Sequence, residues 1–247
     1  MIGNTTIHGP EGEQYQTYTT KRWPLGTKME LQDGRVFRFF LNGAGALTAG
    51  KLIQSPVPGA NFDELVVPAA VPIGTRELTV TNGATTVTAD EFADGYINVE
   101  DDTGEGHLYA IAGNDAEAAG SAALVLRVKR GIILAWTTST TVGLSRNPFA
   151  SAIVHPSPPT ARLLGVVPVA VAAAAYGWVQ TKGPASVLTE GTLIIGLSAQ
   201  ASETTDGCVS PFRLTEAAPP TELAPVVGIV MEVAATTEHS LIYLKLE

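Results

Sequence analysis

The chain has 247 residues and a formal net charge of −9, and charged residues make up only 16% of it. Aromatic residues contribute 6%, whereas aliphatic residues, Gly and Thr fill long runs between turn residues. This composition favours a β-rich scaffold with an aliphatic core. It argues against nucleic acid as the main partner, because neutralising phosphates requires clustered Lys and Arg.

The charge is unevenly distributed. Residues 1–60 hold six basic and four acidic residues, so the rest of the chain carries a net charge of −11. Cys208 is the only cysteine, which rules out an intramolecular disulfide and suits a reducing compartment. The first residues lack the features of a signal peptide, and Gly and Pro interrupt the apolar stretch 163–179. We therefore expect a chain made in the cytoplasm, without a membrane span.

The N-terminal segment, residues 1–34, is predicted to be an extended arm. Gly9, Pro10 and Pro24 interrupt any regular element, and apolar residues are sparse before Trp23. Because this segment has little to bury by itself, it is either an arm laid across a neighbouring subunit or a frayed terminus, and we expect it to be mobile in a free monomer.

A first β-rich domain is predicted at 35–144. Its expected strands are 35–41, 64–67, 77–81, 85–89, 96–99, 107–111, 122–129 and 132–137, with a strand or short helix at 46–54. Asn82-Gly83 between two Thr- and Val-bearing segments predicts a type I′ hairpin turn, which needs positive φ at both central residues.

A Pro-rich linker is predicted at 145–161, followed by a second, barrel-like β-rich domain at 162–247. Its expected strands are 163–172, 176–181, 193–197, 208–214, 226–233 and 241–246. In the last of these, Ile242, Leu244 and Leu246 share one face and should point to the core. No repeat at a fixed spacing is evident. The predicted fold is mainly β, with two β-rich blocks (sandwich or small barrel) preceded by the extended arm.

Few residues predict chemistry. The four histidines are far apart in sequence, so no metal site is expected, and no cofactor motif is found. The acidic loop 100–106 is most simply a solvated connection. Calcium binding there, or a hydrolase using Asp101 and Asp102, remain alternatives. A carbohydrate-binding module using Trp136 or Trp178 is another.

Three stretches together carry a resemblance. They are ALTAGKLIQSP at 46–56; ADGYINV at 93–99 with TGEGHLYAI at 103–111; and YGWVQTKGPA at 176–185 with VVGIV at 226–230. This pattern resembles virion structural proteins of tailed bacteriophages, especially the head-decoration or cement type. The likeness covers roughly residues 40–247 and includes no catalytic residue.

The resemblance implies a non-enzymatic protein on the capsid exterior that binds the major capsid protein, stabilises the shell and self-associates, with a homotrimer expected. A tail, baseplate or head-fibre component is the alternative. Aromatic and basic residues are the usual anchors of interfaces. The candidate capsid or subunit contacts are Lys21, Arg22, Trp23, Lys28, Phe37, Phe39 and Phe40.

Overall fold

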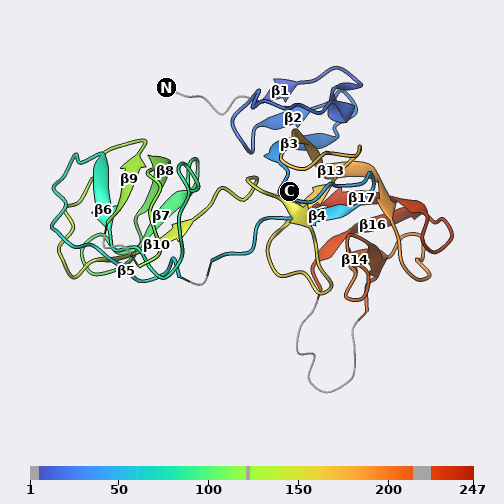
Figure 1. Cartoon of the computed structure of the whole chain (residues 1–247). Helices are drawn as coiled ribbons and strands as arrows, with labels where there is room; N and C mark the ends of the chain where they lie inside the picture. The colour runs from blue at the N-terminus through green and yellow to red at the C-terminus, as the bar shows by residue number, and fades with distance from the viewer. Residues whose placement is uncertain (1–5, 60, 121–122, 214–223) are drawn as a thin grey trace. The chain divides into compact units, whose positions relative to one another are not determined.

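The computed structural model describes residues 6–59, 61–120, 123–213 and 224–247 (Figure 1). These residues form strands and turns, with one short 3-10 helix, η1 (Glu13–Tyr15), and no α-helix among them. The mainly β fold predicted from the sequence is confirmed, with two separate sheets.

The chain forms two compact units. Unit 1 comprises Met1–Val57 and Pro148–Glu247, and unit 2 comprises Pro58–Asn147. The predicted division at 35–144, 145–161 and 162–247 therefore differs from the structure, because residues 35–57 belong with the C-terminal block. The physical reason is strand pairing between residues far apart in sequence, such as Phe39 with Trp178.

Unit 1 is built on one large sheet. The strands along its main path are β1 (Ile7–His8), β2 (Lys28–Glu30), β3 (Val36–Leu41), β13 (Tyr176–Leu188), β17 (His239–Lys245), β16 (Val226–Glu232), β14 (Ser198–Ala201) and β15 (Val209–Pro211). Three further strands, β4 (Leu52–Gln54), β11 (Ile153–Val154) and β12 (Leu163–Val166), pair beside this path. Ile242 and Leu244 are fully buried and Leu246 packs against the same core cluster, which confirms the predicted inner face of the last strand.

Unit 2 is a six-stranded, nearly closed barrel. Its strands, in sheet order, are β5 (Leu65–Val66), β10 (Thr141–Ser145), β7 (Tyr96–Asp101), β8 (Leu108–Asn114), β9 (Leu124–Val128) and β6 (Glu77–Val80). The amide of Thr81, just after β6, donates to Val66 of β5 and brings the two edge strands together. The barrel core includes Phe62, Phe92 and Trp136.

The N-terminal segment is folded onto unit 1 over its described residues, rather than forming the free arm predicted at 1–34. The strand β2 pairs with β3, and β1 pairs with β2, at the blue end of the sheet in Figure 1. Tyr18 exchanges two backbone hydrogen bonds with Tyr176 of β13. Met29 is fully buried against Phe37, Phe39 and Trp178. The segment thus has a partner in its own chain, which its sparse apolar residues did not indicate. Residues 1–5 lie outside the described residues.

A nine-residue motif occurs twice, forty residues apart, although no repeat was expected. It reads NGAGALTAG at 42–50 in unit 1 and NGATTVTAD at 82–90 in unit 2. In both copies the sixth residue forms an isolated antiparallel bridge, Leu47 with Val171 and Val87 with Glu117. The ninth residue of each copy has positive φ. The two units therefore use the same local turn structure.

The buried asparagine at the start of each copy donates hydrogen bonds both to its own turn and to the turn that is bridged to it. Asn82 Nδ2 donates to the carbonyls of Thr85 and Ala118, and Asn42 Nδ2 donates to those of Gly45, Val171 and Ala172. The type I′ turn predicted at Asn82-Gly83 is wrong, since neither residue has positive φ. The β6 strand pairs with β9 instead of forming a hairpin through this turn.

Three of the predicted strands are also wrong. Within 85–89 and 132–137 only single bridges form, at Val87 and Trp136. Residues 193–197 form a turn that precedes β14. Most of the other predicted strands overlap observed ones. Leu214 and Ala122, at the ends of two of them, lie outside the described residues.

Candidate binding surfaces

The three phenylalanines predicted as interface contacts are core residues. Phe37, Phe39 and Phe40 are all 0% exposed. Phe37 and Phe39 pack with Trp178 on one face of β3, while Phe40 packs with Leu47 and other residues of a separate cluster. Because β3 is buried on both faces, these rings are not available to a partner in this fold.

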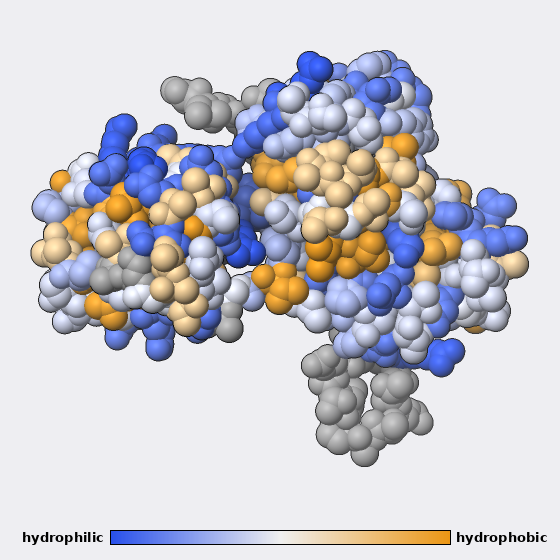
Figure 2. Space-filling view, in the orientation of Figure 1, coloured by the Kyte–Doolittle hydropathy of each residue, from blue (hydrophilic) through white to orange (hydrophobic). Residues whose placement is uncertain are grey.

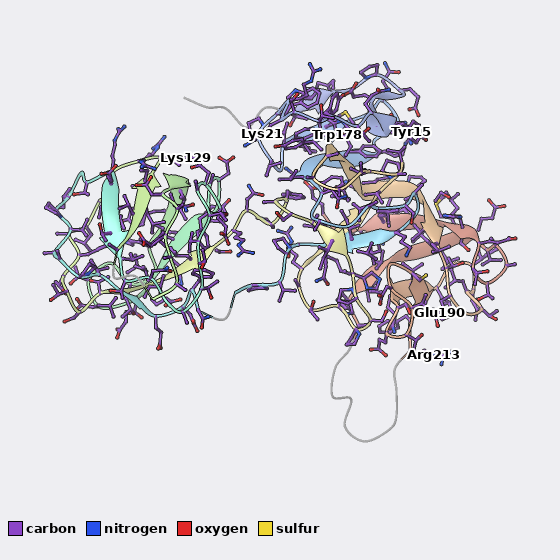
Figure 3. The ribbon with its side chains drawn as sticks, viewed as in Figure 1. Tyr15, Lys21, Lys129, Trp178, Glu190 and Arg213 are labelled. Carbon is purple, nitrogen blue, oxygen red and sulfur yellow. The ribbon has the colours of Figure 1, made fainter. Side chains whose placement is uncertain are left out.

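The other predicted contacts do lie at the surface. Lys21 and Arg22 are exposed, and Trp23 and Lys28 are half-buried. Lys28 forms an ion pair with Glu30 at 3.2 Å. The Arg22 guanidinium lies 5.3 Å from the centre of the Tyr18 ring. In the view of Figure 3, Lys21 and Tyr15 lie on either side of Trp178.

An aromatic cluster holds Trp23 in place. Its ring meets those of Phe39 and Tyr18 edge-on, with centroids 5.2 and 5.6 Å apart, and lies 5.1 Å from Trp178. Edge-to-face contacts of this kind stabilise a fixed ring orientation. The structure therefore brings Trp23 and Arg22 together beside Tyr18, at the mouth of a hollow formed by the N-terminal segment.

Unit 1 also carries a group of exposed apolar side chains that was not predicted from the sequence. We call this group the apolar rim. Its members are Ile194, Ile195, Leu197, Phe212 and Met231, with exposed fractions of 59%, 61%, 56%, 36% and 43%.

Backbone hydrogen bonds hold the rim together across three segments of the sheet. The Gly196 amide donates to Val230, and the Val230 amide donates to Leu197, so the turn lies against β16. The Phe212 amide donates to Ser198, at the start of β14. Apolar residues also gather on the face of unit 1 seen in Figure 2, over β13, β17 and β16. The three segments that carry the rim residues are therefore neighbours in the sheet.

A signal for the rim exists in the sequence. The run Leu193-Ile194-Ile195 lies between Gly191 and Gly196, so it is too short to form a strand buried on both faces. Only Leu193 reaches the core, at 7% exposed. A run of apolar residues confined between glycines therefore indicated a turn with exposed apolar side chains.

Hydrogen bonds from two threonine hydroxyls hold the acidic loop of unit 2, residues 100–106, in place. Asp102 accepts hydrogen bonds from Thr137 and Thr140, and these bonds, led by that from Thr137, lower the pKa of its carboxyl. Among the described residues, no three His, Cys, Asp or Glu side chains gather as a metal site would require. The loop therefore has an observed structural role in joining β7 to the segment before β10.

A second carboxylate, Glu190, fastens a loop of unit 1. It accepts hydrogen bonds from the hydroxyls of Ser202 and Thr204, and the bond from Ser202 is the main cause that lowers its pKa. Arg213 contributes at longer range (Figure 3). Cys208, close in sequence to this loop, is buried, and burial raises the pKa of its thiol.

The tryptophans considered for sugar binding are enclosed. Trp136 is 1% exposed and Trp178 is 0% exposed, so neither offers a ring face to a ligand. Trp23 is the tryptophan whose ring is partly accessible.

Comparison of the chain with protein-family models, with curated proteins and with solved structures finds no match. In the described part of the chain, no helix has the length and apolar character needed to cross a membrane.

Proposed function

We propose that the chain is a structural protein of a tailed-phage virion that binds the outer surface of the capsid as a decoration protein. The role is adhesion and shell stabilisation, without catalysis. Its main partner is the major capsid protein, and its copies self-associate as a homotrimer. The sequence resemblance supports the class of protein, and the apolar rim is the observation that carries the binding role.

The rim suits adhesion because it presents apolar area that the fold leaves in water. Monomeric soluble proteins rarely expose contiguous apolar patches beyond a few hundred Å² unless the patch is functional. None of the five rim side chains is charged. The net negative charge is instead concentrated in unit 2, where five basic residues stand against twelve acidic ones, a net charge of −7 of the total −9. Unit 2 also exposes large apolar side chains, among them Ile73, Leu108 and Ile133 at 66%, 62% and 68%. Because it also carries most of the net negative charge, we assign the contact with a protein shell to unit 1.

Copy number in the particle tests the proposal. Quantitative mass spectrometry of purified virions of the phage that encodes the chain gives its abundance relative to the major capsid protein. A decoration protein is present in hundreds of copies. Tens of copies or fewer would assign it to the tail, baseplate or head fibre, and absence from the particle would refute a virion role.

Rim variants test the assigned surface. Burying the exposed parts of two large aliphatic side chains stabilises a complex by roughly 2–3 kcal/mol, so Ile195→Ser with Leu197→Ser should weaken capsid binding ~30- to 150-fold. The matched control is Ile133→Ser in unit 2, since Ile133 is equally apolar and 68% exposed. Loss of binding in the control alone, or in Trp23→Ala but not in the rim variant, would move the docking surface elsewhere.

Self-association is measured separately by analytical ultracentrifugation of the purified chain. A trimer that survives the rim substitutions agrees with a rim that faces the capsid. Dissociation of the trimer by these substitutions would reassign the rim to the contact between copies.

A further inference from the structure

A hollow of about 490 Å³ lies within the N-terminal segment of unit 1. It is lined by residues of β1, of η1 and of the chain that follows, chiefly Ile7, Pro10, Glu13, Tyr18, Arg22 and Trp23. Small-molecule sites commonly have volumes of about 300–1,000 Å³, with apolar walls and a few polar groups. This hollow has that size and that mixture of side chains.

The aromatic rings that form the apolar wall of the hollow are held in position by contacts within the chain. Trp23 is half-buried, with its ring fixed edge-on against Phe39 and Tyr18. Tyr18 is in turn tied to β13 by two backbone hydrogen bonds with Tyr176. A planar ring that is fixed yet partly accessible loses little conformational entropy on binding.

The polar groups of the hollow have opposite charges and opposite hydrogen-bonding roles. Glu13 is an acceptor and receives a 2.5 Å hydrogen bond from the Tyr18 hydroxyl, while Arg22 is a donor that lies over the Tyr18 ring. Burial, followed by the bond to Glu13, raises the pKa of Tyr18 to about 12, so its hydroxyl stays neutral. The hollow therefore combines one negative group, one positive group and a neutral hydroxyl.

This balance selects the class of ligand. An anion would meet Glu13, and a cation would meet Arg22, so neither charge is favoured. A neutral molecule that offers hydroxyl donors to Glu13, oxygen acceptors to Arg22 and an apolar C–H face to Trp23 satisfies all three. We propose that this hollow binds a neutral pyranose sugar of a glycan. Such a site would let the protein hold a carbohydrate surface, a function separate from the proposed docking on a capsid.

The test uses the full chain on an array of neutral hexose and N-acetylhexosamine oligosaccharides, with sialylated and sulfated glycans as charged comparators. The expected result is binding to neutral glycans. The affinity of the best of them is then measured by isothermal titration calorimetry. Arg22→Gln should weaken it at least tenfold, and Trp23→Ala should abolish it. Tyr15→Ala is the matched control, because Tyr15 is an exposed ring on the same segment that does not line the hollow.

Hydrogen exchange of unit 1 in each variant shows whether the fold is intact, and Arg22→Gln keeps the test valid if Trp23→Ala loosens the aromatic cluster. The proposal is overturned if no neutral glycan binds, if only charged glycans bind, or if binding survives both substitutions. Capture of a peptide by the same residues, without glycan binding, would overturn it as well. Capsid occupancy is a separate readout on particles, so failure here leaves the decoration proposal standing, and the reverse also holds.

Discussion

Replacing Asn82 by Ala should destabilise unit 2 by more than most surface substitutions do. The side chain is 4% exposed, and its amide donates to Ala118 at 2.8 Å and to Thr85 at 3.2 Å. Leaving a buried carbonyl without its donor costs about 1–3 kcal/mol. The substitution also removes Asn82 Oδ1, which is buried without a hydrogen-bond partner, and this offsets part of the loss. The net cost should be about 2–4 kcal/mol in the free energy of unfolding.

The expected shift in melting temperature follows from the size of each unit. Unit 2 spans 90 residues, and unfolding entropies near 2.1 cal/mol/K per residue give it about 0.19 kcal/mol/K. A loss of 2–4 kcal/mol then lowers its melting temperature by about 10–20 °C. Unit 1 spans 157 residues, so the same loss from Asn42→Ala should lower its melting temperature by only about 6–12 °C.

Differential scanning calorimetry measures these shifts, and hydrogen exchange read by mass spectrometry assigns each one to its unit. Asn61→Ala is the matched control, since Asn61 is exposed and donates to the Thr85 hydroxyl at 2.8 Å. Asn82→Asp should cost at least as much as Asn82→Ala, because a carboxylate places an acceptor against two carbonyl oxygens. If Asn82→Ala cost no more than Asn61→Ala, or if Asn82→Asp were as stable as the wild type, the buried hydrogen bonds of Asn82 would not be what stabilises unit 2.

Three further predictions concern packing and titration. Gly165→Ala should destabilise unit 1 by about 3 kcal/mol or more, measured by chemical denaturation. Gly165 has φ +151°, and a methyl group there would overlap the Gln180 carbonyl. Gly34→Ala is the control and should cost only about 1 kcal/mol, because Gly34 has φ +82° but no neighbouring atoms that a methyl group would meet. Trp136→Ala should cost about 3–5 kcal/mol and accelerate hydrogen exchange in unit 2 alone; equal acceleration in unit 1 would contradict two independent cores. Because the pKa of Glu190 is lowered in the folded state, its stabilisation is present above the ordinary value of 4.5 and is lost as pH falls below it. The stability gap between wild type and Glu190→Gln should therefore shrink between pH 7 and pH 3, and a gap that stays constant would count against the hydrogen bonds as its source.

Sequence patterning was sufficient where structure is decided by neighbouring residues. In the last strand, the alternation of Ile242 and Leu244 with Leu241 and Tyr243 identified the buried face, because side chains alternate along a strand. The same patterning failed around Val87 and Trp136. At each of these positions one bridged residue lies between turns. A short β-branched or aromatic segment has the same composition whether it forms a full strand or a single bridge, so the pattern cannot distinguish the two.

The discontinuous unit and the core position of Phe39 could not be predicted locally. Both depend on β3 pairing with β13, about 140 residues further along the chain. When a strand is buried on both faces, polar and apolar residues do not alternate along it, so the sequence does not show that its aromatic side chains lie in the core. The turn at Asn82 shows a different kind of error. Asn-Gly was interpreted as a hairpin turn, its most common use, whereas here the asparagine side chain is buried and donates to the carbonyls of Thr85 and Ala118.

Unit 2 is inserted into unit 1 in a way that should allow its removal. Gln54 pairs with Ile153, so the chain leaves and re-enters unit 1 along neighbouring strands, and the Leu144 amide donates to Phe62 where unit 2 begins and ends. Each unit also has its own core cluster and its own copy of the asparagine turn motif.

Joining Val57 to Pro148 through a short Gly-Ser linker should therefore leave unit 1 folded, with hydrogen exchange in β13 and β17 unchanged. On the proposed function, with the rim in unit 1, the shortened chain should occupy the capsid as the full chain does, while each copy carries a charge less negative by seven. Particles decorated with it should then migrate more slowly toward the anode, and loss of occupancy despite an intact unit 1 would assign the capsid contact to unit 2.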